Sequence, residues 1–149
     1  MLFRSRHLLE LMLANERVRR AVIPSLSEDD YAELATGGIF AAIIHLEGSE
    51  NEFDFDNLNA SLEAELERAL LPALFMSDLS WTGGDDFDTL FKRATAALSS
   101  IRLRRFERML DSLQIEMGQA EREQDAERYQ LLFQRKLELK NRMLGLSAM

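Results

Sequence analysis

The sequence predicts an all-α fold, a small multi-helix bundle followed by a long helix and a C-terminal antiparallel helical hairpin. The stretch 85–146 consists mainly of strong helix formers, and Gly118 is its only glycine or proline before Gly145. Apolar residues recur there at three- and four-residue steps, the period of an α-helix. The run 39–44 is apolar enough for a strand, but no strand partner is evident, so a helix is favoured.

Two long helices account for the last third of the chain. The first is expected from about Asp86 to about Arg122, roughly 55 Å long at 1.5 Å per residue. Its apolar seam comprises Phe106, Leu110, Leu113, Met117 and Ala120. The second helix repeats the seam with Tyr129, Leu132, Leu139, Met143 and Leu146, interrupted by Lys136. A polar turn over 121–125, in which Asp125 can cap the second helix, makes the pair a hairpin.

The final helix carries a second apolar stripe beside this seam, formed by Phe133, Leu137 and Leu144. One stripe is enough to close a hairpin, so the second is available for contact with another molecule. The alternative is that both stripes pack within the chain, against the first arm and the bundle. The periodicity favours neither of these two interpretations.

The N-terminal part predicts short helices with recognisable ends. A helix over 5–13 has an apolar stripe wide enough to be buried on most sides. Asn15 can cap a short second helix, which Pro24 ends. Ser27 and the three acidic residues after it predict the start of a third helix, through Leu34.

In the middle of the chain, residues that end helices alternate with segments of helical periodicity. The Gly37-Gly38 pair is expected to interrupt helical structure before the run 39–44. The polar segment 48–55 is expected to form a surface loop. A single helix is then expected to start at residue 56 or 57 and to break or kink at Pro72. Its apolar positions are Leu58, Leu62, Leu66, Ala69 and Leu70.

A linker over 80–84 predicts two parts, a bundle over 1–84 and the long helix with its hairpin over 85–149.

Residues 1–91 hold 6 Lys and Arg against 18 Asp and Glu, a net charge of -12, whereas 92–149 hold 12 against 8, a net charge of +4. The net acidity argues against strong direct binding of nucleic acid. A cluster of arginines spreads around the long helix, which favours a solvated, ion-paired face over a phosphate track. Its members are Arg102, Arg104, Arg105 and Arg108.

No residue pattern points to catalysis, a cofactor or a metal. The chain has no cysteine, which removes disulfides, thiolate zinc sites and thiol nucleophiles. The pairs Asp54 with Asp56 and Asp86 with Asp88 match a spacing of some magnesium sites, but helix capping explains both. The common phosphate-binding, dinucleotide-binding, esterase and zinc-protease motifs do not occur. We therefore expect a protein that is not an enzyme.

No apolar run reaches the roughly 20 residues that span a bilayer. The N-terminal run carries its charges within an amphipathic pattern and does not resemble a targeting signal. We expect a cytoplasmic protein without a membrane partner.

Two groups of residues resemble the C-terminal domain of bacterial DnaG-type primases. The first is Leu8-Leu9-Glu10-Leu11-Met12-Leu13-Ala14-Asn15-Glu16, followed later by Ser27-Glu28-Asp29-Asp30-Tyr31. The second is Ile115-Glu116-x-Gly118-x-Ala120-Glu121-Arg122-x-x-Asp125-x-Glu127-Arg128, continued by Leu132 and by Lys136-Leu137-Glu138-Leu139-Lys140. The order of elements is similar over nearly the whole chain.

The resemblance implies a non-catalytic domain that docks through its hairpin on the N-terminal collar of the hexameric replicative helicase. Zinc and magnesium belong, in that family, to upstream domains outside this sequence, so no cofactor is expected here. The tail of a single-strand-binding protein is a second implied partner. Placement by element assigns the helicase contact to Tyr129, Leu132, Phe133, Lys136, Leu137, Lys140 and Met143.

Two other interpretations fit the same pattern. One is a self-associating module in which the hairpins of two copies pair as a four-helix bundle. The other is the N-terminal domain of the replicative helicase, which shares the architecture of a bundle followed by a hairpin.

Overall fold

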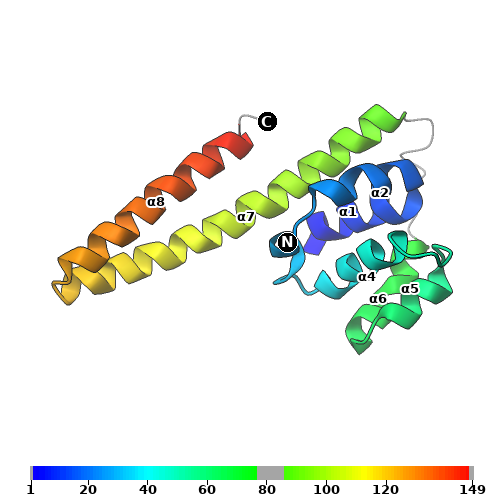
Figure 1. Ribbon diagram of the computed structural model, residues 1–149, viewed down its shortest axis with the longest axis horizontal. Helices are drawn as coiled ribbons and strands as arrows, with labels where there is room; N and C mark the ends of the chain where they lie inside the picture. Colours follow the sequence, from blue (N-terminus) through cyan, green and yellow to red (C-terminus); the bar gives the residue numbers. More distant parts are fainter. Residues whose placement is uncertain (1, 77–85, 148–149) are drawn as a thin grey trace. The chain divides into compact units, whose positions relative to one another are not determined.

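The computed structural model describes residues 2–76 and 86–147, and its regular elements there are helices (Figure 1). They are α1 (Leu2–Ala14), α2 (Glu16–Val22), the 3₁₀ helix η1 (Ile23–Ser25), α3 (Glu28–Tyr31), α4 (Gly37–Glu47), α5 (Phe55–Ser61), α6 (Glu65–Phe75), α7 (Phe87–Arg122) and α8 (Ala126–Ser147). No strand occurs in these ranges, so the predicted all-α class is confirmed, and the run 39–44 lies in α4. None of these helices combines the length and the apolar character needed to cross a membrane.

The chain forms two compact units, Met1–Leu98 and Ser99–Met149. The division therefore falls within α7, later in the chain than the predicted linker 80–84, which lies outside the described residues. The first part of α7 belongs to the first unit because Leu90 and Ala94 are buried. The guanidinium of Arg17 also lies over the ring of Phe87, 4.4 Å from its centroid.

Helix α1 supplies several of the most deeply buried side chains of the first unit. It packs against α2 and α6, while α4 contacts α5 and α6. Four apolar side chains of the predicted wide stripe are buried, Leu8, Leu9, Leu11 and Met12, whereas Leu13 is half-buried. The side chain of Asn15 caps α2 by accepting a hydrogen bond from the Val18 N–H at 3.0 Å, which confirms that prediction.

Three boundaries differ from the sequence-based prediction. Helix α3 ends at Tyr31 rather than Leu34, and the Gly37-Gly38 pair forms the first turn of α4 rather than a break before it. The single helix predicted from residue 56 or 57 is two helices, because Leu62 and Ala64 have extended backbone between α5 and α6. Helix α6 then continues through Pro72 to its end at Phe75.

A buried arginine of α2, Arg19, forms an ion pair with Glu47 at the end of α4. Arg19 is 5% exposed; its Nε donates to Glu47 Oε2 at 2.8 Å and its Nη1 to the Met12 carbonyl at 3.0 Å. The guanidinium also lies 3.6 Å from the centroid of the Phe53 ring, and Arg20 donates to the other carboxylate oxygen of Glu47 at 2.7 Å. Burial would raise the pKa of Glu47, but the hydrogen bonds from Arg20 and Arg19 outweigh it and lower that pKa.

In the second unit, α7 and α8 run antiparallel from a short turn (Figure 1). The Asp125 N–H donates to the Ala120 carbonyl at 2.9 Å and the Gln124 N–H to the Glu121 carbonyl at 3.1 Å, the two bonds of a Schellman motif. Asp125 then caps α8, because its Oδ1 accepts from the Arg128 N–H at 3.1 Å. The capped hairpin predicted from the sequence is therefore present.

We expect Gln124→Gly to raise the free energy of unfolding by about 0.5–1 kcal/mol. Gln124 has φ 58°, the left-handed conformation that favours glycine at this position of the motif. The neighbouring variant Glu123→Gly is the control, since positive φ among the described non-glycine residues is confined to Gln124. Urea denaturation followed by circular dichroism measures both variants, and an equal response in the two would contradict a role for the left-handed backbone.

Candidate interaction surface on the C-terminal helix

The seven residues assigned to partner contact lie on one broad side of α8, given about 100° of rotation per residue. One edge of this side faces the hairpin core. There Leu132 is 3% exposed and packs with Met117 and Ala120 of α7, and Tyr129 is partly buried against the same cluster. Leu132 therefore stabilises the closed hairpin and is not exposed for contact with another protein, whereas Tyr129 keeps part of its side chain accessible.

Lys136 and Met143 occupy an intermediate position on this side of α8. Both are half-buried, although Lys136 interrupts the apolar seam. A lysine can bury its aliphatic stem along apolar surface and keep its ammonium group in water. The two residues therefore border the hairpin core and remain partly accessible.

The other edge of this side is exposed and carries the second apolar stripe. Phe133 is 39% exposed, Leu137 is 48% exposed and Leu144 is 68% exposed. They lie within about 40° of one another around the helix, and Lys140 lies beside them, on the edge nearer the hairpin core. We call these four residues the outer stripe. Within the second unit, therefore, α7 does not cover the three apolar side chains of this stripe.

The borders of the outer stripe carry no acidic side chain. At about 100° per residue, Lys136 lies on one side of the stripe and Gln130, Gln134 and Asn141 lie on the other. Glu138 falls away from it. The surface is therefore apolar at its centre with positive and neutral polar groups around it.

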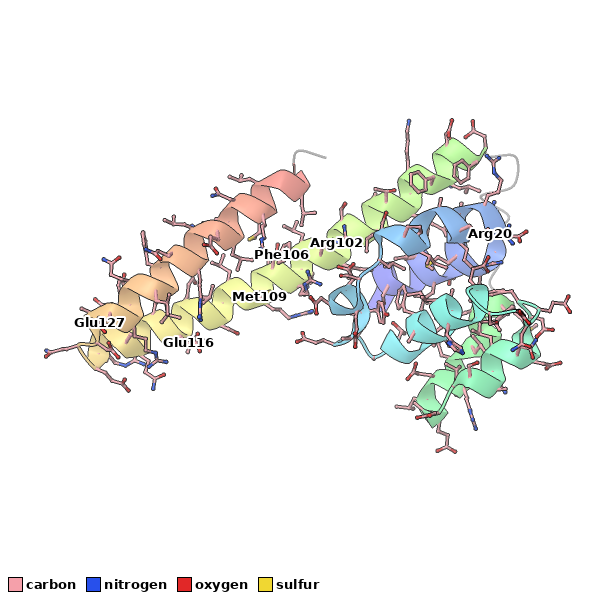
Figure 2. The ribbon with its side chains drawn as sticks, in the orientation of Figure 1. Arg20, Arg102, Phe106, Met109, Glu116 and Glu127 are labelled. Atoms are coloured by element: carbon pink, nitrogen blue, oxygen red, sulfur yellow. The ribbon has the colours of Figure 1, made fainter. Side chains whose placement is uncertain are left out.

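Helix α7 adds further exposed apolar side chains that the seam pattern left unassigned. Met109 is 45% exposed and Ile115 is 72% exposed, whereas Phe106 of the predicted seam is 8% exposed. Figure 2 labels Phe106, Met109 and Glu116 along this helix. The exposure of apolar side chains on α7 follows the helical period. The seam residues are buried or half-buried, and the residues out of phase with the seam are exposed.

The tip of the hairpin has an open depression of about 520 Å³ beside Tyr129, with Glu121 and Asp125 among its lining residues. Asp125 is already engaged as the cap of α8.

Across the described ranges 2–76 and 86–147, no group of histidine, aspartate and glutamate side chains is arranged to hold a metal ion. The first member of each Asp pair acts as a cap, since Asp54 accepts from the Asn57 N–H at 2.8 Å and Asp86 from the Thr89 N–H at 2.9 Å.

The arginine cluster lies on the part of α7 that belongs to the second unit. Arg104 is exposed and Arg102, Arg105 and Arg108 are half-buried, and each has an electrostatic or polar interaction within the chain. The guanidinium of Arg105 also lies 5.0 Å from the centroid of the Phe106 ring.

Comparison of the chain with family models, curated proteins and solved structures gives no match. The fold and the outer stripe define an all-α protein with an exposed apolar surface on a helical hairpin. The resemblance to primase C-terminal domains rests on the residues quoted above.

Proposed function

We propose that this chain is a non-catalytic interaction domain of a DNA primase, which docks on the N-terminal collar of the replicative helicase during primer synthesis. The observation that carries the proposal is the outer stripe, exposed on a hairpin whose seam is already filled. The resemblance at residues 8–16, 27–31 and 115–140 supports the choice of the helicase as the partner.

The outer stripe has the geometry of a helix that binds in a groove. Phe133, Leu137 and Leu144 follow i, i+4 and i+11 spacing and span about 16 Å along the helix. Their exposed apolar surface would leave water on binding, which supplies affinity. Lys136 and Lys140 would favour an acidic partner surface and accelerate association with it.

The test is size-exclusion chromatography with light scattering on the chain mixed with the replicative helicase of the source organism. We expect co-elution, and we expect Phe133→Ala combined with Leu137→Ala to weaken binding at least tenfold, because buried aromatic and aliphatic anchors dominate such interfaces. Leu131→Ala is the matched control, since Leu131 is 51% exposed on the same helix but points to its opposite side.

Elution of the chain apart from the helicase would contradict the proposal, and so would equal weakening by the control variant. Self-association through the same stripe is the second candidate, because two copies could cover each other's exposed leucines. In that case the chain alone would be a dimer, and the double variant would be a monomer without any helicase present.

A further inference from the structure

A groove of about 430 Å³ lies in the first unit, between α4 and the segment that joins α5 to α6. Small residues of α4 form one wall, where Gly38, Ala41 and Ala42 recur at the spacing of one helix face. The opposite wall exists because the backbone is extended at Leu62 and Ala64. The helix break that the sequence did not predict therefore creates this groove.

Glu67 contributes a carboxylate to the groove, whose lining also includes the polar side chains of His45, Ser61 and Glu63. The Oε2 atom of Glu67 is buried and has no hydrogen-bond partner within the described structure. A Cβ on Gly38 would collide with this carboxylate, so the glycine is what allows it to lie against α4. Because a buried carboxylate oxygen without a donor is unfavourable, a small movement of the Glu67 side chain toward a ligand that brings a donor would be stabilised.

The charge around the groove favours a cation. Glu63 is a second carboxylate among the lining residues, which include one histidine, His45, but neither lysine nor arginine. Residues 1–91 as a whole hold 18 Asp and Glu against 6 Lys and Arg. The nearest arginine in sequence, Arg68, donates its Nε to the Leu62 carbonyl at 2.7 Å and so is already engaged.

We propose that this groove binds a lysine or arginine side chain of a partner protein. The aliphatic stem would lie along Ala41 and Ala42, and the cationic head would donate to Glu67. The groove is large enough for such a side chain and part of its backbone, since small-ligand sites start at about 300 Å³. This binding does not depend on the outer stripe of α8 or on the function proposed above.

The experiment is an NMR titration of the ¹⁵N-labelled chain with the blocked tripeptide acetyl-Ala-Arg-Ala-amide. We expect saturable shifts of the backbone signals of Gly38, Ala41 and Glu63, and none of comparable size with acetyl-Ala-Gln-Ala-amide, which lacks the charge. Glu67→Gln is expected to weaken binding at least fivefold, because it removes the charge that receives the cation. Glu65→Gln is the control, an exposed glutamate of α6 outside the groove.

A second variant tests whether the position of the Glu67 carboxylate matters as well as its charge. Gly38→Ala keeps every carboxylate but displaces that of Glu67, so it should also weaken binding, while the dispersed spectrum reports that the fold is retained. Shifts spread over the acidic surface, or equal affinity in Glu67→Gln, would overturn the proposal. Groove shifts that appear on concentrating the chain alone would also overturn it, since a second copy would then be the occupant.

Discussion

The variant Arg19→Met is expected to unfold with a free energy about 3 kcal/mol lower than that of the unaltered chain. Arg19 satisfies three partners at once, because it donates to Glu47 and to the Met12 carbonyl and covers the Phe53 ring. Removing one member of a buried ion pair costs about 3–5 kcal/mol, since the other charge stays buried. The lower end of that range applies because Arg20 still donates to Glu47.

The matched control is Arg20→Met, which removes an arginine from the same carboxylate. The Arg20 side chain is 65% exposed, whereas that of Arg19 is 7% exposed. Exposed ion pairs contribute little, so the control should lose much less stability than Arg19→Met does. Urea denaturation followed by far-UV circular dichroism measures both, and equal losses would show that the burial of Arg19 does not decide its contribution.

The elements that the sequence predicted correctly are those fixed by neighbours along the chain. The seam of the hairpin follows from helical spacing, and Asn15 and Asp125 cap helices through residues only three positions away. The outer stripe was readable for the same reason, because Phe133 and Leu137 lie one turn apart on one helix. Local periodicity thus gave both the hairpin and the candidate surface.

The features that sequence reasoning missed depend on residues far apart in the chain. Nothing between Ser61 and Ala64 signals a helix break, since the segment lacks glycine and proline. The break is a tertiary effect, because it leaves Leu62 buried and Leu66 86% exposed although the pattern made them equivalent. A helical pattern cannot state which of its apolar residues the rest of the bundle will cover.

The buried network and the groove depend on distant residues in the same way. Arg19 meets Glu47 from another helix, and Gly38 of α4 adjoins Glu67 of α6. Helical spacing alone, by contrast, placed Leu132 in the seam and Leu137 in the second stripe, and the packing of α7 against α8 buries the first and leaves the second exposed.

We expect Gly37→Ala to lower the free energy of unfolding by about 2 kcal/mol. Gly37 is buried, and its N–H donates to the Leu34 carbonyl at 2.9 Å. A Cβ at this position would collide with the backbone carbonyl oxygen of Tyr31. Because backbone atoms cannot rotate away as a side chain can, α3 would have to move, and forcing an extra methyl group into a packed site costs about 1–3 kcal/mol.

The neighbouring variant Gly38→Ala isolates this cause, since both substitutions add the same methyl group to the first turn of the same helix. Its Cβ would meet the carboxylate of Glu67, which is the end of a flexible side chain. The gain in helix propensity, up to about 1 kcal/mol, offsets the displacement, so the stability should change by less than about 0.5 kcal/mol. Thermal denaturation of the two variants compares them directly. A similar loss in both would mean that helix entry requires glycine at each position, whereas a loss confined to Gly37→Ala would assign it to the contact between α3 and α4.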